Sequence, residues 1–161
     1  MNVIDHKLAL ERLSRGSPII FQTDTLPAIG CLPKFYEIIY KIKKRDINKP
    51  LILMGAENYQ FNELVHKSAL DDYKFMSSRY WPGPLTMIIP ISEASKSFLP
   101  RSNETLGLRI PNSMMSKFLM RESGPLLTSS ANISGLPPAT TAKNISMDLP
   151  NVDILGPVPW E

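Results

Sequence analysis

Short apolar segments typical of strands alternate with helical patterns along the chain, and 15 prolines separate them. A helix cannot continue through "WPGP" at residues 81–84, because proline lacks the backbone N–H and clashes with the preceding turn. No repeat, low-complexity tract or linker interrupts the alternation. This pattern predicts a single sheet domain of the α/β or α+β class.

The spacing of apolar residues predicts where the elements lie. Residues 35–42 carry apolar side chains at i, i+3, i+4 and i+7, which indicates an amphipathic helix that ends in the basic run "KIKKR". Further helices are predicted at residues 4–13, from a cap at Asp71 or Asp72 to Tyr80, from a cap at Ser113 to Arg121, and after Thr140. Short strands are predicted at residues 18–21, 51–54, 85–91, 105–110 and 125–130.

Length and composition limit the class of protein. At 161 residues and 43% hydrophobic, the chain is long enough to bury the core of one domain over residues 1–161. No apolar run reaches the roughly 20 residues that cross a bilayer, and the charged start "MNVIDHKLALERL" does not resemble a signal peptide. Cys31 is the only cysteine, which excludes an internal disulfide and a multi-cysteine zinc site. We therefore expect a cytoplasmic protein with no membrane partner.

Three of the predicted strands lead into clusters of small polar residues. Phe21 is followed by "QTDT", Leu108 by "RIPNS" and Leu127 by "TSSANISG". Ligands of open α/β sheets bind beyond strand ends, so these loops form a candidate site if they converge. The site would offer hydroxyls, an amide and Arg109, whose planar guanidinium suits a carboxylate or a phosphate. The run "KIKKRDINK" would add positive charge, and the whole chain has a formal charge of +3.

Each of these segments also has a purely structural interpretation. The "QTDT" segment is equally typical of a turn in which Asp and Thr bond their own backbone. The "KIKKR" run is typical of a solvated helix end, and Arg109 could serve only to pair a surface acid. His6 and His66 stand in no recognisable catalytic pattern, and the motifs GxSxG, GxxxxGK[ST], HExxH and GxGxxG do not occur. A pocket that holds small substrates together and neutralises their charge therefore fits better than a protein nucleophile.

Five segments, taken in order, resemble the signature blocks of the YrdC family of threonylcarbamoyl-AMP synthases. They are "QTDTLPAIGC", "KIKKRDINKPLILM", "RYWPGPLTMIIP", "LGLRIPNS" and "TSSANISGLPP", and they span most of the chain between residues 21 and 140. The resemblance implies a twisted mixed sheet with flanking helices and a concave, cationic face. It also implies an enzyme that joins L-threonine, bicarbonate and ATP into threonylcarbamoyl-adenylate and pyrophosphate. A downstream transferase complex would use this product to modify tRNA to t6A.

The resemblance further implies the residues of the site. Those expected to hold ATP are Lys43, Arg45, Lys49, Thr105, Ser130 and Asn132. Those expected to bind threonine are Thr25, Arg109 and Thr128, with Arg109 taking the carboxylate through both edges of its fork. No side chain is expected to act as a nucleophile or to ligate a metal, because Mg²⁺ would arrive with the triphosphate of ATP.

The sequence departs from the family pattern at several places, of which two concern a whole loop or segment. In the loop that the family writes PT[DE]TVYGLG, Gln22, Pro27 and Ala28 replace proline, tyrosine and glycine, which implies an altered backbone path. The sequence also stops before the family's STI-type segment, which implies reduced activity or completion of the pocket by another chain. Two alternatives stay open: a non-catalytic module that binds tRNA or double-stranded RNA through phosphates, and a diverged nucleotide-binding paralogue.

Overall fold

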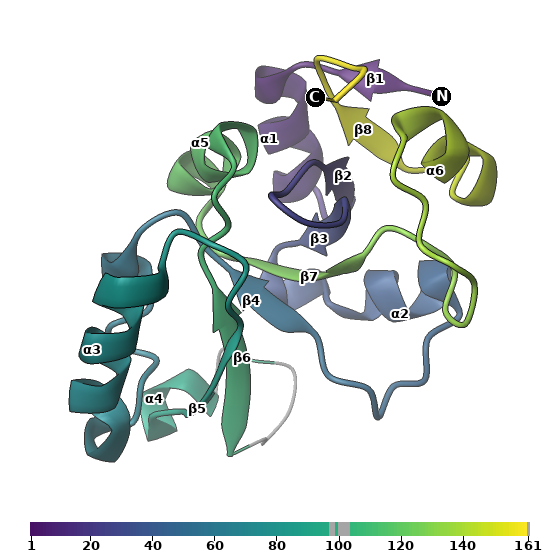
Figure 1. Ribbon diagram of the computed structural model, residues 1–161. Coiled ribbons are helices and arrows are strands. Elements are labelled where there is room, and N and C mark those ends of the chain that lie inside the picture. The colour runs from purple at the N-terminus through teal and green to yellow at the C-terminus, as the bar shows by residue number, and fades with distance from the viewer. Residues whose placement is uncertain (97–98, 100–103, 161) are drawn as a thin grey trace.

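The computed structural model describes residues 1–96, 99 and 104–160, and these form an eight-stranded mixed sheet (Figure 1). Its strands lie in the order β1 (Val3–Ile4), β8 (Asp153–Leu155), β2 (Ile19–Phe21), β3 (Ala28–Cys31), β7 (Leu126–Ser130), β4 (Ile52–Met54), β6 (Thr105–Arg109) and β5 (Met87–Pro90). Strand β8 is parallel to both β1 and β2, and β4 is parallel to β6. The other neighbouring pairs are antiparallel. The predicted mixed fold is therefore confirmed.

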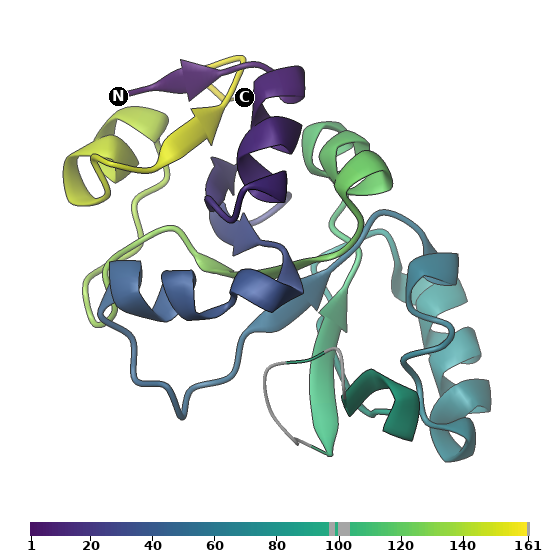
Figure 2. The ribbon, with the colours of Figure 1, turned by 180° about the vertical axis from the view of Figure 1, so that it is seen from behind.

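Six α-helices flank the sheet in the described part of the chain. They are α1 (His6–Ser14), α2 (Glu37–Lys43), α3 (Leu70–Tyr80), α4 (Glu93–Lys96), α5 (Met114–Ser123) and α6 (Ala142–Asp148). Short 3₁₀ turns occupy Pro33–Phe35, Asn58–Gln60 and Lys67–Ala69. Helices α1 and α5 lie side by side in both views of the chain (Figures 1 and 2).

Two clusters of buried side chains form the core. Helices α1 and α5 pack with one cluster, in which Leu13 and Leu119 meet Phe21 of β2. Helices α2, α3 and α6 contribute to the other, in which Ile39 and Ile145 are fully buried. Successive strand residues point to opposite faces, so one strand supplies both clusters. A sheet covered in this way leaves the loops beyond its strand ends as the place where polar side chains can gather.

Sequence periodicity locates most of these elements, but it predicts neither helix α4 nor strands β1, β3 and β8. Ile4 belongs to strand β1 and pairs with Leu155, so its inclusion in the first predicted helix is wrong. Strand β3 falls in a segment with no predicted element, because its four residues are all buried and show no alternation of polar and apolar side chains. Asp71 and Asp72 lie in the first turn of α3 rather than at its cap, which is Ala69. Their negative charges stabilise the helix there, because its amino-terminal end carries the positive end of the helix dipole.

The "WPGP" turn connects the core to the candidate site. The Trp81 Nε1 donates a hydrogen bond to the Leu85 carbonyl at 2.8 Å, and the indole packs against buried rings of the core. The Gly83 N–H donates to the Ile110 carbonyl at 2.9 Å, and the Gly83 carbonyl accepts from Arg109 Nε at 3.2 Å. A β-carbon at Gly83 would lie 2.7 Å from the Tyr80 carbonyl oxygen. This position therefore requires glycine for close backbone approach.

We expect Gly83→Ala to lower the free energy of unfolding by about 1–3 kcal/mol, because the added methyl meets rigid backbone and must displace the turn. Gly107→Ala is the matched control, since its β-carbon would first meet the Thr86 methyl at 3.3 Å, a side chain that can move. Urea unfolding of both variants measures the difference. A Gly107→Ala protein less stable than the Gly83→Ala protein would contradict this account of the turn.

Candidate functional site

The three polar loops predicted to form a site do converge. Arg109 at the end of β6 donates from Nη1 to the Thr25 hydroxyl at 3.0 Å, across 84 residues of sequence. The Ala131 N–H, directly after β7, donates to the Pro27 carbonyl at 2.9 Å. The loop at residues 22–27 therefore contacts both of the others. Strands β3, β7, β4 and β6 are consecutive neighbours in the sheet, which places the loop ends close together.

Arg109 is the centre of the threonine side of the predicted site. It is only 7% exposed, and its Nη2 forms an ion pair with Asp24. Its Nε bonds the Gly83 carbonyl and its Nη1 bonds Thr25. These contacts use three of the five N–H groups of the guanidinium. Among the residues that the structure describes, no contact uses the other two, which are therefore available to a ligand. The interpretation of Arg109 as a residue that pairs an acid and the interpretation as a ligand donor are thus compatible.

The hydroxyl of Thr23 holds the "QTDT" loop in shape. Thr23 Oγ1 donates to the Leu26 carbonyl at 2.8 Å and accepts from the Thr25 N–H at 3.0 Å. The turn that these bonds build explains why Asp24 and Thr25 lie together against Arg109. Ala28 begins β3 in register with Phe21 and Ser130, so its backbone is in the extended strand rather than in the left-handed region.

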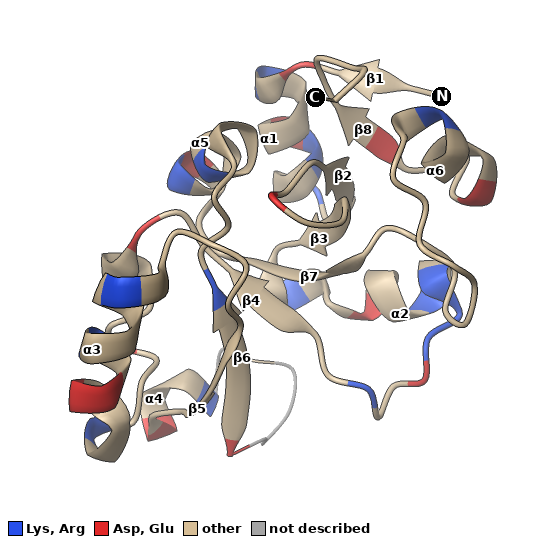
Figure 3. Cartoon of the chain, in the orientation of Figure 1, with Lys and Arg blue, Asp and Glu red and all other residues tan. Residues whose placement is uncertain are grey.

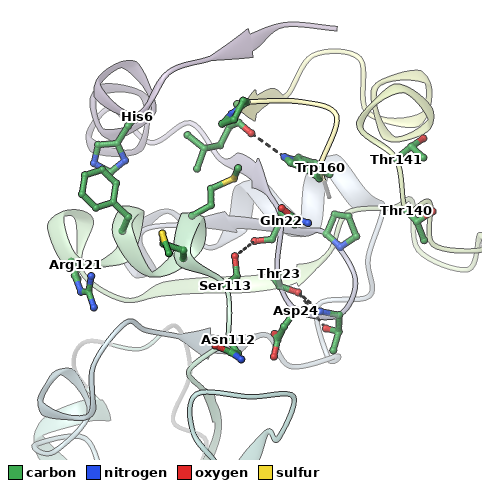
Figure 4. Close-up of a pocket in the computed structure, with 18 residues that line it drawn as sticks. His6, Gln22, Thr23, Asp24, Asn112, Ser113, Arg121, Thr140, Thr141 and Trp160 are labelled. Carbon is green, nitrogen blue, oxygen red and sulfur yellow. Dashed lines mark hydrogen bonds between the residues drawn. The ribbon is translucent and has the colours of Figure 1, made fainter.

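A cavity of about 1170 Å³ opens between this loop, the start of α5 and residues 155–160, and we call it the loop cavity (Figure 4). Asp24 and Thr25 line it on one side, and Trp160 lines it on another. The Trp160 Nε1 donates to the Leu155 carbonyl at 3.2 Å, which fixes the indole beside the end of β8. Phe118 adds an apolar wall, and the centroid of its ring lies 4.2 Å from the centroid of the His6 ring. A cavity of this size and mixed polarity suits a ligand with both charged and planar parts.

Lys43 lies on the nucleotide side of the predicted site, but it is buried. It is 1% exposed, and its Nζ donates to the carbonyls of Ser130 and of Asn132, the latter at 2.6 Å. Its own carbonyl accepts from the Ser134 N–H at 2.9 Å. The structure therefore brings Lys43, Ser130 and Asn132 together as predicted, with the lysine tying the "SAN" loop to the end of α2. Burial, and to a smaller extent the charge of Arg45, lowers the pKa of Lys43 to about 8.

Three buried polar atoms around this loop have no hydrogen-bond partner among the described residues. They are Asn132 Oδ1, Ser134 Oγ and Arg45 Nε. Asn132 is 6% exposed, and its Nδ2 donates to the Ile133 and Leu136 carbonyls, which leaves its oxygen free. Buried polar groups without a partner are rare and commonly mark the place of a ligand or an ordered water. Donors and acceptors are thus available on this side for a polar ligand.

The other predicted residues are placed separately. Lys49 is exposed in the loop after α2, and Thr105 lines a smaller cavity of about 160 Å³ beside Asn48 and Pro50. The Arg45 Nη2 donates to the Pro50 carbonyl at 2.9 Å, which links this loop to the Lys43 group. Thr128 is 1% exposed, and its hydroxyl donates to the Ile52 carbonyl at 2.9 Å across to β4. The structure therefore groups Thr25 with Arg109, and leaves Thr105 at the opposite end of β6.

Positive charge is gathered unevenly around these loops. Basic residues cluster at the end of α2 and in the loop after it, whereas Asp24 places a negative charge in the loop at residues 22–27 (Figure 3). Two candidates that sequence reasoning did not assign become visible here, namely Asp24 through its ion pair and Ser134 through its unpartnered hydroxyl. Both stand inside the quoted blocks "QTDT" and "SANISG", so their neighbours in the sequence were the available signal.

Metal-binding clusters and membrane-spanning helices do not occur over residues 1–96, 99 and 104–160. No three His, Cys, Asp or Glu side chains gather there in a way that would hold a metal ion. None of the helices in those ranges has the length and apolar character that crossing a membrane requires.

The fold and the cavity define a mixed α/β domain with a candidate ligand site beyond its strand ends. A family model named Sua5_yciO_yrdC, with the description "Telomere recombination", matches residues 11–155, and the chain belongs to this family. A curated threonylcarbamoyl-AMP synthase of Pseudoalteromonas atlantica is 32% identical over 161 residues, covering 96% of this chain and 84% of the relative.

Two solved structures are similar to this chain in fold. Sua5 of Pyrococcus abyssi, solved in complex with L-threonine, superposes with a TM-score of 0.87 at 26% identity. The match covers 96% of this chain and 50% of that protein, so the chain spans half the length of this relative. YciO of E. coli superposes with a TM-score of 0.75 at 22% identity, covering 96% of this chain and 81% of that one, and supports the fold.

The buried position of Lys43 predicts a dependence of stability on pH. Its pKa is about 8 when folded and 10.5 at its ordinary value, so between these values the unfolded chain binds the proton more tightly. The stability that depends on Lys43 therefore rises with pH across this window, by at most about 1.4 kcal/mol per pH unit. We expect the free energy of unfolding of the unmodified protein, minus that of Lys43→Met, to increase from pH 8 to pH 10.5 in urea unfolding.

The subtraction removes the contributions of Cys31 and Tyr73, because burial raises both of their pKa values to about 12 in either protein. Lys44→Met is the control, because it removes a neighbouring lysine whose side chain is exposed. A difference for Lys43→Met that does not change between pH 8 and pH 10.5 would show that the Lys43 ammonium is not desolvated.

Proposed function

We propose that this chain makes threonylcarbamoyl-AMP and pyrophosphate from L-threonine, bicarbonate and ATP. The product would serve the t6A modification of tRNA through a separate transferase. The observation that carries the proposal is the contact between Arg109 and Thr25, two residues from distant segments that meet beside the loop cavity. The curated relative of Pseudoalteromonas atlantica bears the name of this activity over nearly the whole of the present chain.

On the amino-acid side, the two remaining N–H groups of Arg109 would receive the carboxylate of threonine. A guanidinium held rigidly by three protein contacts loses little entropy when it binds a planar anion. The Thr25 hydroxyl, already bonded to Nη1, would contribute a second polar contact at the same place. Thr128 would support the site from within the sheet, because it is buried and its hydroxyl donates to the Ile52 carbonyl.

On the nucleotide side, ATP would bind with its magnesium as one substrate. Arg45 and Lys49 stand at the surface end of the α2 loop, where they would neutralise phosphate charge. The unpartnered Asn132 Oδ1, Ser134 Oγ and Arg45 Nε are available for hydrogen bonds to the nucleotide or its waters. Lys43 would hold the "SAN" loop in shape and place a positive charge next to that loop. Thr105 would contribute only if the nucleotide reached the smaller cavity.

The chemistry needs positioning more than a protein nucleophile. The amine of threonine attacks bicarbonate to give a carbamate with loss of water, and a carbamate oxygen then attacks the α-phosphorus of ATP as pyrophosphate leaves. Holding the reactants side by side replaces encounters in solution, and cations offset the charge that develops on the phosphates. A cavity of about 1170 Å³ is large enough for an amino acid and part of a nucleotide together.

Pyrophosphate release by the purified chain, with threonine, bicarbonate, magnesium and ATP each omitted in turn, tests the proposal. Release that needs both threonine and bicarbonate is the expected result. ATP binding without turnover would favour a diverged nucleotide-binding paralogue. No ATP binding, together with RNA binding that weakens steeply with salt, would favour the RNA-binding module.

Two substitutions should separate the sides of the site. We expect Arg109→Lys to raise the KM for threonine by roughly tenfold or more and that for ATP by less than about threefold, because it removes the planar fork. Arg45→Ala should show the reverse pattern, since it removes a cation from the phosphate side. Steady-state kinetics with one substrate varied at a time provides the measurement. Parallel changes in both KM values would contradict the division.

A further inference from the structure

We infer that Asp24 binds the α-ammonium group of the amino-acid substrate. The inference rests on the proposed function and deepens it, by naming the group that recognises the amine. Asp24 has no role among the residues that the family motifs imply. Its place in the structure assigns it one, through its contact with Arg109, its position on the cavity wall and the charges of the other lining residues.

The contact with Arg109 uses one side of the Asp24 carboxylate. Its Oδ1 accepts from Nη2 of Arg109, and the Asp24 side chain is 14% exposed. A carboxylate accepts at two oxygens, so Oδ2 is left with its own lone pairs. In the described part of the chain, no contact of Oδ2 competes for this position. The carboxylate is therefore fixed in orientation and still able to accept.

The two partners of the ion pair differ in their relation to the loop cavity, because Asp24 lines it and Arg109 is not among its lining residues. Asp24 and Thr25 line the loop cavity, whereas Arg109 stands behind them and bonds the Gly83 carbonyl with its Nε. Figure 4 shows Asp24 among the residues drawn around this cavity. A ligand that enters from the cavity therefore meets the carboxylate and the hydroxyl first.

The charges of the cavity wall favour a cation at this point. Asp24 is the only acidic residue among the lining residues that the structure describes. Arg121, the arginine on the same wall, is engaged by Glu57 at 2.7 Å. An ammonium group that entered the cavity would thus find one carboxylate, whose side chain is 14% exposed and is held in place by Arg109. A carboxylate that is partly shielded from water and fixed in orientation binds a cation more strongly than a flexible surface acid.

The arrangement also matches the shape of the substrate. Threonine binds as a zwitterion whose ammonium and carboxylate share one carbon, and the Asp24–Arg109 ion pair offers the opposite charges as neighbours. The carboxylate of threonine would take the free N–H groups of Arg109 while its ammonium takes Asp24 Oδ2. Pairing both charges at once would make recognition depend on the presence of the amine. A role for Asp24 that only orients Arg109 would not create this dependence.

The test compares two ligands that differ only in the amine. L-threonine and 3-hydroxybutyrate share the carboxylate, the hydroxyl and the methyl group, and the second lacks the ammonium. Isothermal titration of both into the unmodified chain, Asp24→Asn and Asp24→Glu gives the preference for the amine in each protein. Asp72→Asn is the matched control, because it makes the same change of charge on the exposed start of α3.

We expect Asp24→Asn to weaken threonine binding by roughly tenfold to a hundredfold while changing 3-hydroxybutyrate binding by less than about threefold. Asp24→Glu and Asp72→Asn should keep the preference for threonine. Equal losses of affinity for both ligands in Asp24→Asn would show that Asp24 acts only by orienting Arg109. That result would overturn this inference and leave the proposed function in place. An unmodified chain that binds both ligands equally would also overturn the inference, without any variant. An unmodified chain that binds no threonine would overturn the proposed function with it.

Discussion

The guanidinium of Arg109 is the interaction on which the candidate site depends. It joins the "WPGP" turn through Gly83, the "QTDT" loop through Asp24 and Thr25, and the end of β6 through its own backbone. These three segments are separated in the sequence, and the Arg109 side chain contacts two of them directly. A buried cation with one anionic partner is costly to leave unpaired, so loss of any of these contacts would disturb the others. The geometry of the loop cavity thus follows from one side chain.

Lys43 plays a comparable part on the other side. It ties the end of α2 to the loop after β7 with bonds from both its side chain and its backbone. Two cations that the family motifs assign to ligands therefore hold the polar loops of the candidate site in place. These contacts explain why the loops can be short and still have defined shapes.

Much of the fold follows from the sequence, because amphipathic spacing and proline punctuation are local signals. Ser113 caps α5 as predicted, with its hydroxyl accepting from the Ser116 N–H. Strand β1 could not be found in this way, since it has two residues and its Ile4 also falls at helical spacing. Strand β3 escaped because a fully buried strand has no alternating pattern.

The site was predictable only in its composition. Strand ends with small polar residues indicated a candidate site if the loops converged, and the structure brings Thr25 and Arg109 into contact. The burial of Lys43 and Thr128 was not accessible, because it depends on which carbonyls turn toward each side chain. Asp24 was overlooked for the same reason. Its importance comes from the side chain it faces across 85 residues, and not from its neighbours in the chain.

The position of β8 has a consequence for how the protein is made. This strand, at residues 153–155, lies between β1 and β2 and is parallel to both, so the first strands of the chain have no direct pairing with each other. During synthesis, this edge of the sheet cannot form until residues 153–155 have left the ribosome. Pairings of such long sequence separation form slowly and leave strand edges exposed meanwhile. Strand β1 therefore has no partner, and β2 has one open edge, until residues 153–155 have been synthesised.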